Sequence, residues 1–116
     1  MNFEDLQRIA KEEMTALLGE LPREVRSEVD SVPIFFEALP DDSDVASGIA
    51  RDTLGFYDEG SPGAPTPRIR LWLENLWEYS EEDEEIFRDE IHITLLHEIG
   101  HFLGWDEDDL TARDLD

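Results

Sequence analysis

The sequence predicts one small domain that contains both helices and strands. Its 116 residues suit a single modest hydrophobic core. Apolar residues recur with a helical period near the N-terminus and again before the C-terminus, whereas residues 68–74 alternate between apolar and polar. We therefore expect residues 1–116 to form a single domain.

The first expected element is an amphipathic helix of about 16 residues, followed by a second, shorter helix. Asn2 is the candidate N-cap of the first helix, and Gly19 is its candidate C-terminal stop. Pro22 suits the first turn of the second helix. The apolar stripe of the first helix consists of Phe3, Leu6, Ala10, Met14 and Leu17. Both helices are expected to pack into the core as scaffold.

Residues 32–74 carry the expected strands. Residues 32–37 are β-branched and aromatic and predict a strand, and residues 54–57 predict a short strand or turn. Residues 68–74 alternate most clearly and are the best candidate strand. The Pro/Gly-rich stretch 60–67 is expected to be a loop within the domain, and the acidic stretch 40–44 a solvated loop that opens a short helical turn.

A long helix is expected from Ser80 to about Leu103. Ser80 and Asp83 have the spacing of a capping box, and the acidic run after Ser80 suits the positive end of the helix dipole. The apolar side of this helix is expected to face the core through Leu95, Ile99 and Phe102. Glu90 and Thr94 fall on the opposite side.

That opposite side carries the pattern His97-Glu98-Ile99-Gly100-His101. Residues four apart on a helix differ by about 40° in direction, so His97 and His101 leave the same face and are placed to clamp one Zn²⁺. Glu98 lies about 100° from His97, which suits a general base acting on a metal-held water. His92 is nine residues from His101 and points to the other side, so we do not expect it to be a ligand.

A catalytic zinc site with two histidines needs a third protein ligand. Gly104 is expected to end the helix in a left-handed turn that brings the following carboxylates toward the metal. Glu107 lies three residues past this glycine, the spacing at which the extended H-E-x-x-H-x-x-G-x-x-H pattern places its last ligand. Glu107 is the predicted third ligand, with Asp106 and Asp108 as alternatives.

The amino-acid composition limits the metal ligands and the kinds of partner that are expected. The chain has no cysteine, so any zinc must be held by histidine and carboxylate. A formal net charge of -22 disfavours nucleic acid and anionic membranes and favours basic peptides. The N-terminus lacks the pattern of a signal peptide and no segment has the length of a membrane span, so we expect a cytoplasmic protein. The oligomeric state is not predicted.

On these residues the chain resembles the short bacterial zincin-like metallopeptidases, whose signature is H-E-x-x-H-x-x-G-x-x-D near the C-terminus. The resemblance covers most of the chain, since the two N-terminal helices, the strand at 32–37, the turn at 54–57 and the strand at 68–74 follow that family's order. It implies an α+β fold, a minimal zincin-like domain with a small sheet above the metal-binding helix. It also implies zinc ligands at His97, His101 and position 107, where this chain has Glu instead of Asp, and an acid/base role for Glu98.

The function expected from these observations is zinc-dependent hydrolysis of peptide bonds in a peptide or protein substrate, with Glu98 as general acid/base. The strand at 68–74 is the candidate to hold an extended substrate along a sheet edge. Tyr57, Tyr79 and Arg70 are candidate donors to the developing oxyanion. The alternatives are a metal-stabilised binding or regulatory domain without turnover, and an acidic module that binds a basic partner.

Overall fold

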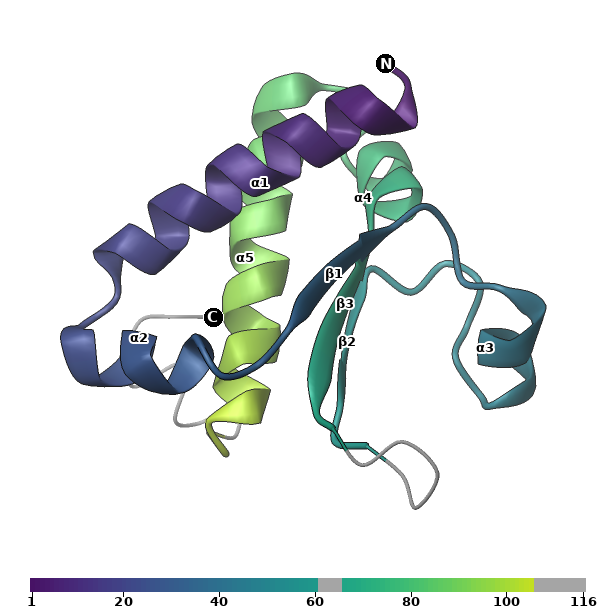
Figure 1. Cartoon of the computed structure of the whole chain (residues 1–116). Helices are drawn as coiled ribbons and strands as arrows, with labels where there is room; N and C mark the ends of the chain where they lie inside the picture. The colour runs from purple at the N-terminus through teal and green to yellow at the C-terminus, as the bar shows by residue number, and fades with distance from the viewer. Residues whose placement is uncertain (61–65, 106–116) are drawn as a thin grey trace.

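The structure is a computed structural model that describes residues 1–60 and 66–105. It has an α+β architecture in which helices pack on one face of a small sheet (Figure 1). In chain order its elements are α1 (Phe3–Glu20), α2 (Arg23–Val29), β1 (Ile34–Glu37), α3 (Asp42–Ala46), β2 (Gly55–Asp58), β3 (Arg68–Trp72), α4 (Leu73–Tyr79) and α5 (Glu84–Phe102).

The described strands form a three-stranded sheet in the order β1-β3-β2. β1 pairs with β3 in parallel, with Ile34 opposite Ile69. β2 pairs with β3 antiparallel, with Tyr57 opposite Ile69 and Phe56 opposite Arg70. β3 is therefore the central strand, and the prediction that it offers a free edge to a substrate is wrong.

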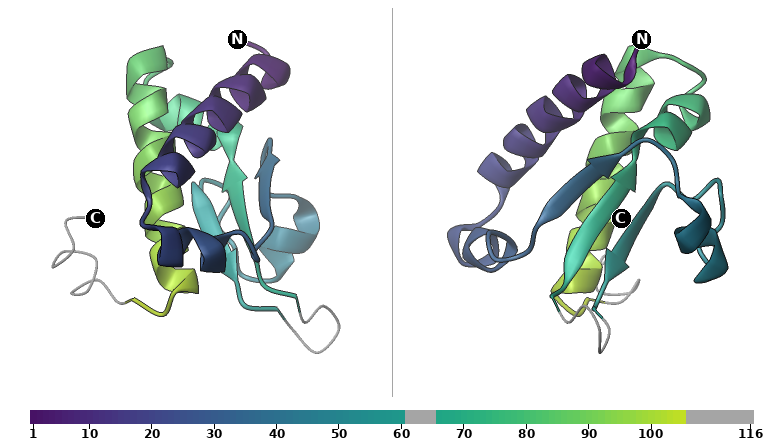
Figure 2. Two further views of the ribbon diagram at one scale, coloured as in Figure 1. Left: turned by 60° about the vertical axis from the view of Figure 1, so that its left-hand side comes forward. Right: turned by 45° about the vertical axis from the view of Figure 1, so that its right-hand side comes forward.

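The two faces of the sheet differ in what covers them. Ile69 and Leu71 of β3 are fully buried on the face that packs against α5. Helices α1 and α5 lie together on this side, whereas α3 lies on the other side (Figure 2). The core between sheet and helices also includes residues from α1, α4 and α5, among them Leu6, Ile9, Leu76, Phe87, Ile91 and Leu95. None of the helices in the described part of the chain is long and apolar enough to cross a membrane.

The N-terminal helices begin where the sequence predicts. Asn2 caps α1 through a capping box with Asp5, whose backbone N–H lies 2.9 Å from the Asn2 side-chain oxygen. Pro22 precedes the first turn of α2 as its N-cap. Gly19 does not stop α1, because the helix continues to Glu20 and ends at Leu21, whose backbone is extended. An extended residue followed by proline ends a helix as well as a left-handed glycine does.

The predicted helix from Ser80 is wrong in its first turn. The buried Ser80 hydroxyl donates to the carbonyl of Leu76 at 2.7 Å, so Ser80 ends α4 instead of capping the next helix. Glu81 and Glu82 then adopt positive φ angles of 57° and 58°. Asp83 is the N-cap of α5 and accepts from the Ile86 N–H. The acidic run therefore serves as a tight connection between two helices.

Arginines tie the elements together across the fold. The Arg70 side chain, only 6% exposed, forms paired hydrogen bonds with Glu37 of β1 and with Asp44 of α3, all between 2.7 and 2.8 Å. Its guanidinium also lies over the Trp72 ring, 4.8 Å from the centroid. Arg88 of α5 reaches Glu12 and Glu13 of α1.

The Arg70 pairs change the ionisation of their partners. The hydrogen bonds from Arg70 lower the pKa of Asp44 from 3.8 to about 2, and the two carboxylates raise the pKa of Arg70. Asp44 also closes a capping box with Asp41 at the start of α3. The acidic stretch is predicted to be a solvated loop that opens a short helical turn. The helical turn is present and capped, and it is anchored to the sheet through Arg70.

Replacing Asp44 with Asn should lower the free energy of unfolding by about 2 kcal/mol at pH 7, which corresponds to the pKa shift. A carboxyl whose folded pKa is depressed contributes stability above its unfolded pKa and loses it as the pH falls through the folded pKa. The gap between wild type and variant should therefore close between about pH 4 and pH 2. Urea unfolding across this pH range measures it.

The matched control is Asp42→Asn in the same helix turn, because Asp42 is 98% exposed and lies 3.7 Å from Arg51. It should change stability by less than about 0.5 kcal/mol. A gap for Asp44→Asn that is absent at pH 7, or unchanged at pH 2, would show that the Arg70 pair does not stabilise the fold.

Candidate metal centre

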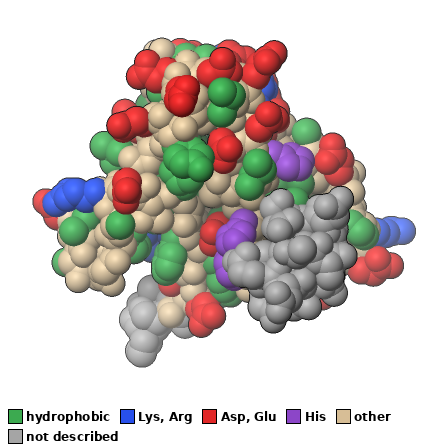
Figure 3. Space-filling model, turned by 180° about the vertical axis from the view of Figure 1, so that it is seen from behind, with side chains coloured by type: hydrophobic (Ala, Val, Ile, Leu, Met, Phe, Trp, Pro, Cys, Tyr) green, Lys and Arg blue, Asp and Glu red, His purple; other side chains and the backbone are tan. Residues whose placement is uncertain are grey.

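The two histidines of the pattern lie side by side on the last turns of α5. The Nε2 atoms of His97 and His101 are 2.9 Å apart, and their ring centroids are 4.6 Å apart at an interplanar angle of 77°. Both side chains reach the surface, His97 half-buried and His101 exposed. Histidine side chains lie among acidic ones on this face of the molecule (Figure 3).

This arrangement follows from how α5 is packed. Ile91, Leu95 and Ile99 are buried against the core and fix the rotation of the helix about its axis. Residues four apart on the opposite side must then project outward one turn apart. The packing of the helix therefore turns both imidazoles outward on the same side.

The histidine pair fits a zinc ion. Two imidazole nitrogens bound to one tetrahedral Zn²⁺ lie about 3.3 Å apart, since each Zn–N bond is about 2.0–2.1 Å. The observed separation of 2.9 Å differs from this by a few tenths of an ångström, which small side-chain rotations supply. The two Nε2 atoms lie within hydrogen-bond distance of each other, so one ion could contact both after such rotations.

The helix ends directly after the second histidine. Gly104 has a φ angle of +80°, and its N–H donates to the carbonyl of His101. The N–H of Trp105 donates to the carbonyl of Gly100 at 2.9 Å. These two bonds make a Schellman motif, in which a left-handed glycine reverses the chain. The turn predicted from Gly104 is confirmed.

The third ligand is still a prediction. Glu107 and its alternatives Asp106 and Asp108 lie outside the described residues. Within residues 1–60 and 66–105, no group of three or more histidine and carboxylate side chains is placed to hold a metal. The histidine pair is therefore the part of the predicted site that the structure brings together.

Glu98 lines a hollow beside the histidines. The residue is 9% exposed, and the hollow has a volume of about 290 Å³. The lining residues come from α5 and from the end of β2: Phe56, Tyr57, Glu59, Glu98 and His101. A carboxylate, an imidazole and a phenol thus share one opening, which can admit a small part of a substrate.

Strand β2 reaches this hollow because it packs closely on α5. A Cβ on Gly55 would lie 2.8 Å from Leu71 Cδ2 and 2.8 Å from the γ-methyl of Thr94, so any larger residue would force one of these side chains to shift. Further along, the Tyr57 ring meets Phe102 edge to face, with centroids 5.8 Å apart. Thr94, which the sequence placed on the site face, supports β2 with its methyl group.

Two of the three predicted oxyanion donors lie elsewhere. Tyr79 is 62% exposed and lines a different hollow, with Asn75 and Leu54. Arg70 is engaged by Glu37 and Asp44. Only Tyr57 lines the hollow with Glu98 and His101. Phe56 and Glu59 were given no role by sequence reasoning, because their place around this hollow depends on strand order.

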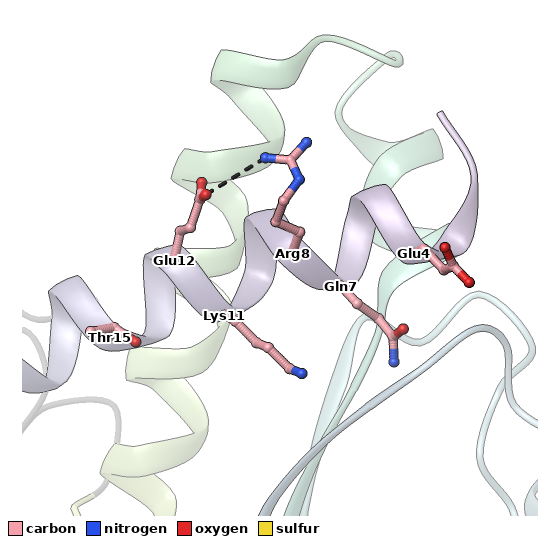
Figure 4. A pocket seen from close by; sticks show the side chains of 6 residues that line it. All are labelled: Glu4, Gln7, Arg8, Lys11, Glu12 and Thr15. Atoms are coloured by element: carbon pink, nitrogen blue, oxygen red, sulfur yellow. Dashed lines mark ion pairs between the residues drawn. The ribbon is translucent and has the colours of Figure 1, made fainter.

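A larger hollow of about 670 Å³ lies over α1, remote from this chemistry. The side chains that line it come from one helix and point in different directions, with Arg8 and Glu12 paired at 3.6 Å (Figure 4). They form no convergent set of groups. We therefore do not regard it as the functional site.

Comparison with known proteins agrees with the geometry. The family model described as zincin-like metallopeptidase matches residues 29–116, which include the whole described sheet and α5. No curated protein matches the chain. The match confirms the resemblance that the sequence pattern indicated.

Replacing Gly55 with Ala should destabilise the fold by about 1–3 kcal/mol, because the new methyl group must displace the buried Leu71 or the stiff Thr94. Gly19→Ala is the matched control. Nothing lies within 4 Å of its Cβ position, and it sits in α1, so it should stabilise by up to about 1 kcal/mol. Urea unfolding compares them, and equal effects of the two changes would contradict the close packing of β2 on α5.

Proposed function

Because the chain belongs to the zincin-like metallopeptidase family, we propose that it is a zinc-dependent peptidase in which Glu98 is the general acid/base. The observation that carries the proposal is the proximity of the His97 and His101 Nε2 atoms, 2.9 Å apart, beside a hollow lined by the buried Glu98. Through this hollow, a substrate carbonyl can approach both the histidine pair and Glu98.

His97 and His101 would hold the zinc ion through Nε2, with Glu107 as the proposed third ligand. When bound in such a site, zinc polarises a substrate carbonyl and lowers the pKa of a coordinated water to about 7. The buried side of α5 fixes the orientation of the helix and so keeps the two imidazoles on the same face. The longer side chain of Glu107, where the family has Asp, keeps a carboxylate at the expected position in the sequence.

Glu98 would move the proton. Its carboxylate accepts a proton from the attacking water as the water oxygen bonds to the carbonyl carbon, and then gives it to the departing amine as the C–N bond breaks. Glu98 is 9% exposed, and low solvent access strengthens the interactions of its carboxylate with charges that develop in the hollow.

The substrate would lie along β2. This strand pairs only with β3 among the described strands, so its other edge is available for main-chain hydrogen bonds to an extended peptide. β2 replaces β3 as the proposed substrate strand, and its end lines the hollow through Phe56 and Tyr57. The net charge of -22 supports basic peptides as the preferred substrates.

Purified without chelator or histidine tag, the wild type should contain about one zinc per chain by elemental mass spectrometry, the stoichiometry of a single site. The His97→Ala/His101→Ala variant should contain none. His92→Ala is the matched control and should retain zinc, because His92 projects from another side of α5. Wild-type protein that takes up no zinc, even when zinc is added back, would refute the metallopeptidase proposal.

Replacing Glu98 with Gln should leave zinc content unchanged and reduce peptide cleavage by at least about 100-fold, because the ligands remain and the base is lost. Cleavage of a basic peptide library, followed by mass spectrometry, measures this. Glu85→Gln in the exposed first turn of α5 is the control and should cleave normally. A zinc-loaded wild type without cleavage would point instead to a metal-stabilised binding domain.

Replacing Glu107 with Ala should weaken zinc binding by at least about 100-fold, since even loss of a group that only orients a ligand weakens binding about 10–100-fold. Asp106→Ala should weaken it only slightly. Competition with a chromophoric chelator measures both affinities. The reverse order would assign the third ligand to Asp106, and equal small effects would favour Asp108.

A further inference from the structure

We propose that the Tyr57 hydroxyl donates a hydrogen bond to the oxyanion that forms on the substrate carbonyl during hydrolysis. This inference rests on the proposed peptidase function and adds a catalytic residue to it. The structure assigns the role to Tyr57 by placing its side chain in the hollow that Glu98 and His101 share.

The position of Tyr57 follows from the register of β2. Tyr57 lies two residues after Gly55, so both face α5, and Tyr57 pairs across the sheet with Ile69, which is buried on that same face. The edge-to-face contact with Phe102, at an interplanar angle of 73°, fixes the ring against the last turn of α5. The Tyr57 phenol is held between β2 and α5. It is therefore well placed to reach the carbonyl of a substrate bound between these two elements.

The state of the phenol suits a donor. Burial raises the pKa of Tyr57 above its ordinary value of 10, and the charges of Glu59 and Asp58 raise it further. The hydroxyl is therefore protonated at neutral pH. Among the described residues, the Tyr57 side chain is held through its ring by Phe102 and its hydroxyl makes no hydrogen bond. The O–H group is accordingly available to a ligand.

The step leaves the Tyr57 proton in place. As the water oxygen bonds to the carbonyl carbon, the C=O π electrons move onto the carbonyl oxygen, and Glu98 takes the water proton. The Tyr57 O–H donates to that oxygen more strongly as negative charge develops on it. When the C–N bond breaks, the electrons return to form the product carbonyl and Glu98 protonates the amine. Tyr57 thus acts by stabilising charge and is unchanged at the end.

The experiment is Tyr57→Phe, which removes the hydroxyl and keeps the ring that contacts Phe102. Loss of one oxyanion donor typically costs about 100–1,000-fold in kcat. We expect a kcat reduced by about 100-fold, KM within about twofold of wild type, and unchanged zinc content. Tyr79→Phe is the matched control, because Tyr79 lines the separate hollow, and it should leave kcat unchanged.

A second readout is independent of turnover. Phosphonamidates of basic peptides carry a tetrahedral anionic group that mimics the oxyanion, and isothermal titration measures their affinity for zinc-loaded protein. Tyr57→Phe should weaken this binding by about the same factor as kcat, as expected for a transition-state analogue. A structural role for the ring would leave both values unchanged in the Phe variant.

The outcomes separate this inference from the function on which it rests. Wild-type cleavage that needs Glu98 but not the Tyr57 hydroxyl, with equal phosphonamidate affinity in the Phe variant, would overturn the role of Tyr57 alone. Zinc-loaded wild type that neither cleaves peptides nor binds phosphonamidates would overturn both. Selective loss of kcat and of phosphonamidate affinity in Tyr57→Phe, with Tyr79→Phe normal, would establish the role.

Discussion

The packing of α5 against the sheet is the constraint on which the rest of the structure depends. Its buried side, which includes Leu95 and Ile99, sets the rotation of the helix, and this rotation turns His97 and His101 outward together. Gly55 then lets β2 approach the helix closely enough for a strand end to reach the hollow. The histidine pair, Glu98 and the end of β2 are thus positioned by one helix–sheet contact.

Sequence reasoning predicted most of what is local. The Asn2 cap, the turn at Gly104 and the meeting of His97 with His101 all depend on residues within a few positions of one another, where helix geometry determines the result. The errors at Gly19 and Ser80 both concern helix boundaries: α1 runs past Gly19 to an extended Leu21, and Ser80 ends α4 where a helix start was predicted. In both cases the pattern of residue types does not distinguish between the predicted and the observed boundary.

Features that depend on residues far apart in the sequence could not be predicted from local patterns. Alternation identified residues 68–74 as a strand without showing that β3 is central and that the chain turns into α4 after Trp72. The choice among Tyr57, Tyr79 and Arg70 likewise needed the strand order, since all three residues have suitable chemistry. Residues 54–57 did carry one local signal. Gly55 precedes Tyr57 by two residues, so both fall on the same face of the expected strand, and a glycine within a strand can mark a close approach of another element.

The arginine cross-links have a consequence for how partners approach. Arg70 and Arg88 join elements of the fold, and Arg68 pairs with Asp58 across β3 and β2, so these cations are occupied within a chain that has 31 acidic residues and 9 basic ones. The surrounding field is therefore strongly negative, with a reach of about 8 Å at physiological ionic strength. Encounter with a cationic peptide would be accelerated by long-range attraction and slowed by added salt. The ionic strength of the surroundings would then set how fast the protein meets its substrate, even where the chemistry in the hollow is unchanged.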